Sequence, residues 1–194
     1  MTFWGWLAMV VLFLYLPIPL YWFVLHPAVK FWRGHPTAAY VTGFLLAWPP
    51  VTAALVLCRR ALVRSDSAPW EAIAAGLGLI VLEGWFSWRV YRDLGRARLV
   101  GKTELSGGGE MAYRGIYARI RHPRYTGSFL AIIGASLLAG TRMLWLVAFA
   151  WAVLMRVAIW LEERELRSRF GAAYEEYCRR VPRFIPALRK PQRG

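Results

Sequence analysis

Cysteine and histidine are scarce in this chain, which has two cysteines and three histidines among its 194 residues. Cys58 and Cys178 stand far apart and outside any C-x-x-C spacing, so we expect two free thiols and neither a disulfide nor a metal site. The G-x-G-x-x-G fingerprint, the Walker loop and the H-E-x-x-H pair are also absent. The sequence therefore gives no support to a Rossmann dinucleotide site, a P-loop or a zinc protease.

Acidic residues are also few, 11 against 25 Lys and Arg, which gives a formal net charge of +14. At the same time 58% of the residues are hydrophobic, which is too apolar for a soluble domain. In such a chain the expected partner of the excess positive charge is the headgroup of anionic membrane lipid. Nucleic acid is not an expected partner, because the basic residues flank apolar runs and no recognition motif accompanies them.

Charge is missing altogether from several long stretches. The first of them, Phe3–Leu25, is longer than the roughly 20 residues that a helix needs to cross a bilayer. Pro17 and Pro19 predict a kink within it. No Lys or Arg precedes Lys30, so the run lacks the cationic start of a secretory signal, and we expect it to be retained as a first span.

Two further apolar runs follow. Residues 38–58 are uncharged, with two adjacent prolines in their middle, and predict a second, bent span. A third helix is expected to start after the polar stretch 65–67 and to end at Trp88, with Glu83 as its one charge in an apolar setting.

The C-terminal part of the chain predicts a helical hairpin and a tail. Residues 125–161 are apolar for too long to form one helix and are interrupted at 140–142, so we expect two helices joined by a tight turn. From Glu162 onward apolar residues recur every three or four positions, which predicts an amphipathic helix that Pro182 and Pro186 stop. The expected fold is an all-α polytopic membrane protein with about five transmembrane helices plus a C-terminal amphipathic helix.

The distribution of basic residues predicts the orientation. Residues 89–124 contain nine Lys and Arg and no long apolar run, so they are expected to lie outside the membrane. With five spans, twenty basic residues fall in the segments on one side and four in those on the other. The positive-inside rule then places the C-terminus and residues 89–124 in the cytoplasm and the N-terminus outside.

The first string with chemical content is R-H-P-R-Y-T-G at residues 121–127, where the cytoplasmic segment meets the fourth span. Pro123 suits the first turn of a helix, whose unpaired N–H groups and positive dipole end can hold an anion such as a cofactor carboxylate. The alternative is a basic interfacial anchor, since Arg, His and Tyr are common at membrane boundaries.

The second string begins with the acidic pair Glu162-Glu163 at the end of the fifth span. Two adjacent carboxylates at a membrane boundary are costly unless they have partners. One interpretation is a solvated helix end paired with Arg164 and Arg167. The other is that one carboxylate accepts hydrogen bonds from a ribose or an amino group while its neighbour pairs with an arginine.

Together the two strings resemble the isoprenylcysteine carboxyl methyltransferase and phospholipid methyltransferase superfamily. The pattern is R-H-P-x-Y-x-G, then one helical hairpin, then E-E-x-x-L-x-x-x-F-G-x-x-Y-x-x-Y-x-x-x-V-P, within residues 109–186. The positions that carry the resemblance are Arg121, His122, Pro123, Tyr125, Gly127, Glu162, Glu163, Leu166, Phe170, Gly171, Tyr174, Tyr177, Val181 and Pro182.

The resemblance implies a cytoplasmic pocket for S-adenosyl-L-methionine, built from the last two helices and the tail, with a lipid-like acceptor entering from the bilayer. It divides the chain into three N-terminal transmembrane helices, 1–88, and a unit of cofactor-binding segment, transmembrane hairpin and amphipathic tail, 89–194. The positions that match cofactor contacts of the family are Met111, Ala112, Tyr117, His122, Pro123, Arg124, Tyr125 and Glu162.

For catalysis the resemblance implies an arginine of the fifth helix near the reacting groups, and Arg156 is the candidate. Arg156 and Glu163 are seven residues apart and can share one helix face. A carboxylate acceptor, such as a prenylcysteine, would be oriented by Arg156. An amine or thiol acceptor would have to lose a proton, and Glu163 or Glu83 would be the candidate base. The alternative for Arg156 is simple snorkelling or pairing with Glu83.

Two other functions fit parts of the pattern. A membrane NADPH-dependent reductase of the sterol reductase type has an R-H-P-like string and a Y-C-x-x-V-P ending, which resembles residues 177–182. A non-catalytic membrane scaffold would bind neither cofactor. His26 and His35 flank the first loop, and we expect them to be interfacial and without a chemical role.

Overall fold

The computed structural model describes residues 1–94 and 111–185, and within these ranges the chain is helical without strands. The first span is divided at Pro17 into α1 (Phe3–Tyr15) and α2 (Ile18–Leu25), which confirms the predicted kink. A short α3 (Val29–Arg33) leads into α4 (Pro36–Leu62), which continues through Pro49 and Pro50.

The remaining elements build the rest of the bundle and the site. They are α5 (Trp70–Leu94), the 3₁₀ turn η1 (Gly115–Ala118), α8 (Pro123–Ala139), α9 (Arg142–Phe170) and α10 (Ala172–Arg180). The glycines at 107–109 and the expected stop at Pro186 lie outside the described residues.

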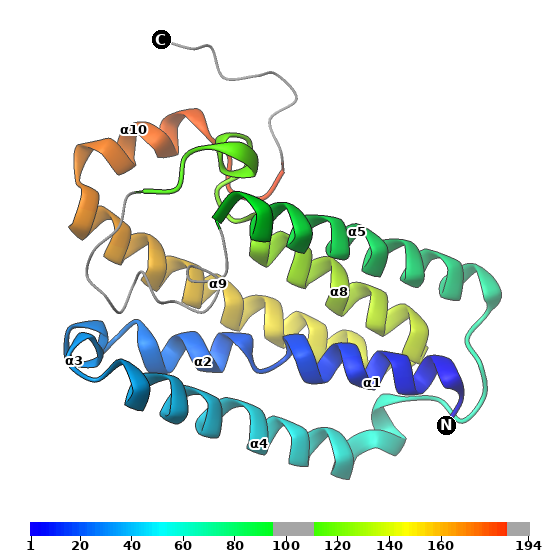
Figure 1. Cartoon of the computed structure of the whole chain (residues 1–194). Helices are drawn as coiled ribbons and strands as arrows, with labels where there is room; N and C mark the ends of the chain where they lie inside the picture. The colour runs from blue at the N-terminus through cyan, green and yellow to red at the C-terminus, as the bar shows by residue number, and fades with distance from the viewer. Residues whose placement is uncertain (95–110, 186–194) are drawn as a thin grey trace.

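In the described part, four helical segments are long and apolar enough to cross a membrane, namely Phe3–Leu25, Pro36–Leu62, Trp70–Leu94 and Arg142–Phe170. The fifth expected span, α8, has 17 residues. At about 1.5 Å per residue it is somewhat shorter than the roughly 30 Å of a bilayer core. The successive long segments alternate in direction, so α10 lies at the end of the bundle opposite the N-terminus (Figure 1).

Two helix ends differ from the sequence prediction. The third span was expected to end at Trp88, but α5 continues to Leu94. The guanidinium groups of Arg89 and Arg92 lie over the rings of Trp85 and Trp88, four residues earlier, at 5.7 and 4.9 Å. Such cation–π pairs let the helix carry charge beyond its apolar run.

The amphipathic segment is also not one helix. Its first part belongs to α9, which runs from the membrane-type segment without interruption to Phe170. Gly171 then adopts φ +52°, a left-handed region that favours glycine, and α10 starts in a new direction. The tight turn between α8 and α9 is confirmed, since Gly140 has φ +67° and the Thr141 hydroxyl caps α9 by accepting from the Leu144 amide at 3.3 Å.

Helix α8 lies against α5, α1 and α9 (Figure 1). Its closest approach is to α5, where Gly76 and Gly134 meet so tightly that a Cβ on Gly134 would lie 2.8 Å from the carbonyl oxygen of Gly76. Small residues at such crossings allow backbone contact between helices in a bilayer. Large apolar side chains such as Leu57, Val81 and Phe149 are instead exposed on the outside, as expected for surfaces that face lipid.

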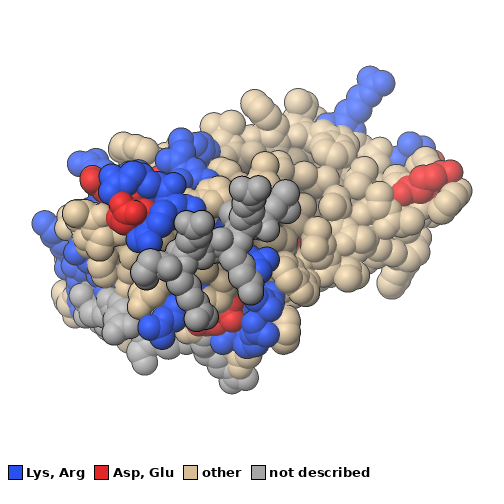
Figure 2. All heavy atoms as spheres, turned by 90° about the horizontal axis from the view of Figure 1, so that it is seen from above, with Lys and Arg blue, Asp and Glu red and all other residues tan. Residues whose placement is uncertain are grey.

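Charged side chains gather at one end of the bundle. Figure 2 shows Lys and Arg concentrated at the end that carries α10, whereas the flank of the bundle is largely free of them. Arg33 belongs to this end, because it pairs with Glu165 of α9 at 3.2 Å. Arg64 lies at the other end, beside the Gly140 turn. Among the described residues, Arg33 and Arg64 thus lie at opposite ends of the bundle.

Candidate functional site

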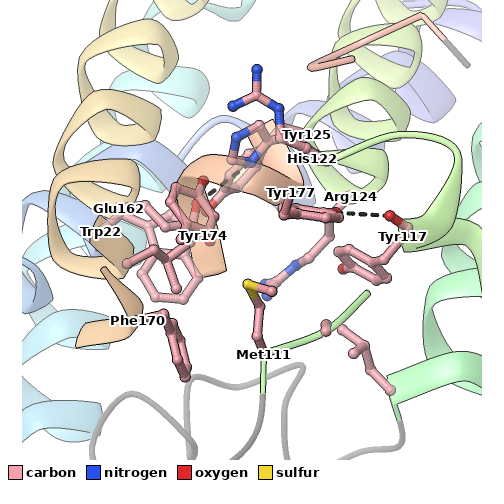
Figure 3. Close-up of a pocket in the computed structure, with 14 residues that line it drawn as sticks. Trp22, Met111, Tyr117, His122, Arg124, Tyr125, Glu162, Phe170, Tyr174 and Tyr177 are labelled. Atoms are coloured by element: carbon pink, nitrogen blue, oxygen red, sulfur yellow. Dashed lines mark hydrogen bonds and ion pairs between the residues drawn. The ribbon is translucent and has the colours of Figure 1, made fainter. Parts of the chain in front are cut away.

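A cleft opens at the basic end of the bundle, between α2, α5, the segment before η1, the start of α8, the end of α9, and α10 (Figure 3). Its space measures about 830 Å³, counted to the open mouth. Its walls are mostly aromatic and apolar, and they consist of Trp22, Leu94, Met111, Ala112, Tyr117, Arg121, His122, Arg124, Tyr125, Glu162, Leu166, Phe170, Tyr174 and Tyr177.

The structure brings seven of the eight sequence-predicted cofactor residues to this cleft, namely Met111, Ala112, Tyr117, His122, Arg124, Tyr125 and Glu162. The eighth, Pro123, is fully buried at the first position of α8 and does not line the cleft. Its ring fixes the start of the helix, which sets the direction of the following side chains.

Two polar groups in the cleft have capacity for a ligand. The Glu162 Oε2 atom is buried and has no hydrogen-bond partner among the described residues; His122 Nδ1 lies 3.8 Å from it. The Arg124 guanidinium lies 5.4 Å from the ring centre of Trp22 and has no ion-pair partner within the part of the chain that the structure describes. The cleft therefore offers one acceptor and one cationic donor to a bound molecule.

Buried tyrosines shape the other side of the cleft. The Tyr177 hydroxyl donates to the carbonyl oxygen of Tyr117 at 2.8 Å, which ties α10 to η1 (Figure 3). Burial, with the nearby Glu163 charge acting on Tyr174, raises the pKa of both Tyr174 and Tyr177 well above the usual value for a phenol. Both phenols therefore stay neutral at physiological pH and act as hydrogen-bond donors.

The two motifs meet through backbone hydrogen bonds. The amides of Arg121 and His122 donate to the carbonyls of Pro182 and Arg183 at 2.8 and 3.1 Å, and Arg121 Nε donates to the Val181 carbonyl at 2.9 Å. The V-P-R segment thus lies directly beside the start of α8. This contact brings residues 60 positions apart in sequence into one wall of the site.

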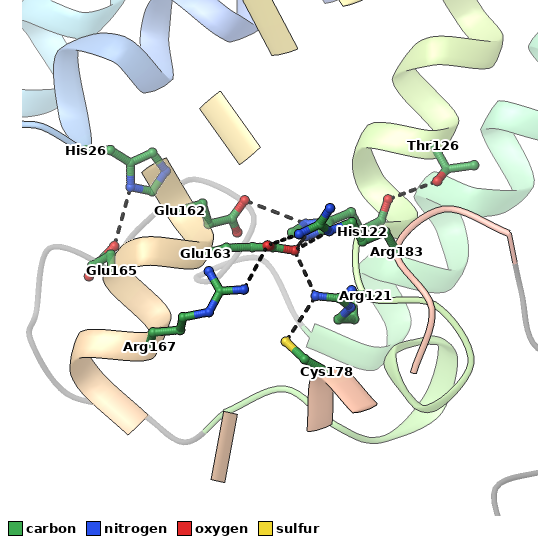
Figure 4. Close-up of polar contacts among 10 residues, drawn as sticks. All are labelled: His26, Arg121, His122, Thr126, Glu162, Glu163, Glu165, Arg167, Cys178 and Arg183. Carbon is green, nitrogen blue, oxygen red and sulfur yellow. Dashed lines mark hydrogen bonds and ion pairs between the residues drawn. The ribbon is translucent and has the colours of Figure 1, made fainter. Parts of the chain in front are cut away.

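Glu163 is the centre of an ion-pair network behind this wall (Figure 4). Its side chain is 1% exposed. Arg121 donates to it at 2.8 Å, His122 Nε2 lies at 3.1 Å, Arg183 contacts both oxygens at 3.0 and 2.8 Å, and Arg167 contacts one at 3.4 Å. Glu163 does not line the cleft, and its oxygens are saturated by these partners. Of the two adjacent acids, Glu163 is therefore the one that pairs with arginine, and Glu162 is the one that lines the cleft.

Arg156 lies elsewhere, in a second cavity between α8, α9 and Phe184 whose space measures about 670 Å³, counted to its open mouth. This cavity is strongly apolar, and its lining consists of Tyr125, Thr126, Phe129, Trp151, Ala152, Met155, Arg156, Ile159 and Phe184. Tyr125 lines both this cavity and the cleft. Glu83 is not a partner of Arg156 in the described structure; its carboxylate accepts from Ser87 inside the bundle.

Several residues of the site were not assigned from the sequence. Arg121, Tyr174 and Tyr177 stand inside the quoted motifs, and Arg183 follows the second motif directly; the spacing of the motifs does not show the contacts of these residues. Trp22 had no local signal, since it is one of 11 tryptophans.

His26 is buried, with a side chain that is 3% exposed, and its Nδ1 lies 3.4 Å from Glu165 Oε2. That it has no chemical role stays a prediction.

The prediction of free thiols is confirmed, with Cys58 exposed and Cys178 partly buried. The Cys178 sulfur accepts from Arg121 at 3.0 Å, at the edge of the Glu163 network. Among residues 1–94 and 111–185, no group of three or more His, Cys, Asp and Glu side chains could hold a metal ion.

Comparison with known proteins gives one family and several relatives. The phospholipid methyltransferase profile matches residues 72–173. The chain is 35% identical over 82 residues to protein-S-isoprenylcysteine O-methyltransferase of Schizosaccharomyces pombe, covering 38% of this chain and 32% of the relative. It is 27% identical over 133 residues to methanethiol S-methyltransferase 2 of Bradyrhizobium diazoefficiens, covering 61% and 50%. A methanethiol S-methyltransferase of Crocosphaera subtropica is 35% identical over 74 residues, covering 38% and 28%.

The chain therefore spans half or less of the length of these relatives. No solved structure matches it at a significant level. The matched region begins in α5 and ends in α10, so it contains the start of α8 and the acidic pair but not the first two spans.

Proposed function

This chain belongs to the phospholipid methyltransferase family, and from that premise we propose that it transfers a methyl group from S-adenosyl-L-methionine to an acceptor that reaches the site from the membrane. The observation that carries the proposal is the pairing of two cavities across Tyr125. One is aromatic with Glu162 and Arg124 available, and the other is apolar and contains Arg156.

The residues of the cleft fit the proposed cofactor. S-adenosyl-L-methionine would supply a methyl group on a positively charged sulfur, next to an amino-acid end and a nucleoside. The free Glu162 oxygen suits an ammonium or ribose hydroxyl, and the unpaired Arg124 suits a carboxylate. Phe170 and Tyr174 offer apolar and aromatic surface for a base.

The N-terminus of α8 supports anion binding beside Arg124. The helix begins at Pro123, and the Thr126 amide donates to the His122 carbonyl at 3.0 Å. Helix N-termini stabilise negative charge through their backbone amides and through the dipole. We propose that the carboxylate of the cofactor lies here.

The apolar cavity supports an acceptor with a hydrophobic body. Arg156 is the one formally charged side chain in its described lining, and that lining contains no carboxylate. A carboxylate acceptor needs no base, because the anion itself attacks the methyl carbon as the carbon–sulfur bond breaks. We therefore propose that Arg156 orients an acidic headgroup, as in a prenylcysteine-type substrate, rather than removing a proton.

Glu163 is a poor candidate for the base that an amine or thiol acceptor would require. Its two oxygens are already bound by Arg121, His122, Arg167 and Arg183, and it does not line either cavity. We propose instead that it positions the wall of the cleft. Positioning of two reactants in line contributes much of the rate in a transfer of this kind.

The two ends of the bundle differ in charge, and this supports a cytoplasmic site. The end with the cleft carries most of the Lys and Arg side chains (Figure 2). By the positive-inside rule we propose that this end and the C-terminus face the cytoplasm, with the N-terminus outside. Lys and Arg around the mouth would also attract anionic lipid headgroups.

Calorimetric titration of the detergent-solubilised chain with S-adenosylhomocysteine and with NADPH tests the reaction class. We expect S-adenosylhomocysteine to bind and NADPH not to bind. NADPH binding alone would favour a reductase, and binding of neither would favour a scaffold; either result would overturn the proposal. Transfer of labelled methyl into extracted lipids, proteins and volatile compounds then identifies the acceptor. A Glu162→Gln variant, which should bind S-adenosylhomocysteine more weakly, serves as one control. Glu176→Gln, on the exposed face of α10, is the matched control that should leave binding unchanged.

A further inference from the structure

One wall of the cleft comes from a part of the chain that the family profile does not cover. Trp22 lies in α2, fifty residues before the matched region starts, yet it lines the cleft (Figure 3). Its side chain is nearly fully buried, at 3% exposed. Helix α2 reaches the site because it packs on α4 and on α9. The first span is therefore part of the site and not only of the bundle.

Trp22 holds a cleft residue in place. The Arg124 guanidinium lies over its ring, 5.4 Å from the ring centre. This contact restricts a long, flexible side chain without using its hydrogen-bond donors, which stay available to an anion. The indole Nε1 of Trp22 is itself buried without a hydrogen-bond partner in the described structure. Such an orphaned donor costs free energy, which is a common feature of sites built for a ligand.

Trp22 is in turn fixed from behind by a three-residue bridge. The His26 ring, one helical turn later, stacks on the indole with centroids 5.0 Å apart. His26 Nδ1 lies 3.4 Å from Glu165 Oε2, a close contact outside hydrogen-bond geometry (Figure 4). Arg33 donates to the other oxygen of Glu165 at 3.2 Å. Glu165 follows Glu162 by one turn on α9. The bridge therefore links the first span to the helix that carries the acidic residue of the cleft.

We propose that Trp22 is a positioning residue for the cofactor site. It fixes the Arg124 guanidinium against the carboxylate of the cofactor's amino-acid end, and the His26–Glu165–Arg33 bridge in turn fixes Trp22. This inference rests on the proposed function, because it requires a ligand with an anionic group at that place. It assigns a role to the first span, which contains neither of the two motifs.

Two ligands that differ in one group separate this role from a general structural one. S-adenosylhomocysteine carries the amino-acid carboxylate, whereas 5′-methylthioadenosine lacks the whole amino-acid end. Trp22→Leu is expected to weaken binding of the first by about 2- to 30-fold, the range of one cation–π contact, and to leave binding of the second unchanged. Trp22→Phe keeps an aromatic face and is expected to restore most of the affinity.

A double-mutant cycle tests whether Trp22 acts through Arg124. In an Arg124→Gln background, Trp22→Leu should cause no further loss of S-adenosylhomocysteine affinity, because the group it positions is gone. Trp6→Leu is the matched control, since Trp6 belongs to the same first span but is 59% exposed on the outside of the bundle. This variant should bind both ligands as the unmodified chain does.

The outcomes separate the two proposals. An unmodified chain that binds neither ligand would overturn the proposed function and this inference with it. An unmodified chain that binds S-adenosylhomocysteine, with Trp22→Leu affecting both ligands equally or neither, would overturn the inference alone. If Trp22→Leu does not fold, Glu165→Gln gives the answer, because it weakens the bridge without lining the cleft. It should cause the same carboxylate-selective loss at a smaller size, and an equal effect on both ligands would refute the role of Trp22.

Discussion

Replacing Glu163 with glutamine removes the negative charge at the centre of the network while keeping the volume of the side chain. Two of its partners, Arg121 and His122, have side chains that are 10% and 4% exposed, so their contacts lie in a poorly solvated environment. The other two, Arg167 and Arg183, are 42% and 36% exposed and are screened by water. Breaking a buried ion pair on one side typically costs about 3–5 kcal/mol, because the remaining charges stay buried without a partner.

We therefore expect Glu163→Gln to lower the free energy of unfolding by about 3 kcal/mol, the lower end of that range, since glutamine retains part of the hydrogen bonding. This corresponds to a fall in Tm of roughly 6–12 °C for a chain of this size. Thermal unfolding in detergent, followed by circular dichroism, measures it. Glu176→Gln is the matched control, because Glu176 also pairs with two arginines but on an exposed face of α10. Its Tm should change by about 1–2 °C at most.

The same variant separates positioning from base catalysis. If Glu163 positions the wall of the cleft, the variant should bind cofactor more weakly but keep most of its kcat at saturating cofactor. A base would instead lose kcat while Tm and cofactor affinity stay close to normal. A Tm shift no larger than that of Glu176→Gln would refute the structural reasoning, whatever the activity.

Three further substitutions test the site and the bundle. Glu162→Gln should weaken S-adenosylhomocysteine binding by about 10- to 100-fold in calorimetry, because a charged hydrogen bond contributes about 1.5–3 kcal/mol. An unchanged Kd would contradict the proposed contact between the Glu162 carboxylate and the ligand. Arg156→Ala should raise KM for a carboxylate acceptor at least tenfold while the Kd for the cofactor stays constant. A change in the cofactor Kd without a change in the acceptor KM would contradict the assignment of Arg156 to the acceptor cavity. Gly134→Ala should lower Tm, because the new Cβ would lie 2.8 Å from the backbone carbonyl oxygen of the facing helix. Gly78→Ala is the control, since its Cβ would have open space and the change should preserve or raise Tm. Equal effects of the two substitutions on Tm would refute the close helix crossing.

The sequence predicts the membrane segments well because they depend on local composition. Long uncharged runs such as Phe3–Leu25 leave few alternatives to a spanning helix, and Gly140 at a positive φ marks the turn between α8 and α9. Helix ends are predicted less well. Arg89 and Arg92 look like a stop in the sequence, but stacking on the tryptophans one turn earlier lets α5 continue.

The cleft is predictable where the motifs carry it and not where contacts between distant elements build it. The resemblance to known methyltransferases directs attention to His122 and Glu162, and the structure brings both to one cleft. It does not show that Arg183 returns to bind Glu163, because that contact depends on the turn at Gly171 and on the backbone pairing with Arg121. The contribution of Trp22 depends in the same way on the packing of α2 against α9.

The acidic pair shows why spacing alone leaves the chemistry open. Neighbouring residues on a helix point about 100° apart, so Glu162 and Glu163 face different surroundings, and of the two only Glu162 lines the cleft. The sequence requires that the two acids have different partners but does not decide which acid faces inward. The start of α8 and the V-P-R segment decide it, because they place the side chains of Arg121, His122 and Arg183 around Glu163, whereas one oxygen of Glu162 has no hydrogen-bond partner among the described residues. The contacts of Arg121 with Val181 and Pro182 and of Arg183 with Glu163 hold this arrangement, so the course of the chain after Gly171 determines which of the two acids lines the cleft.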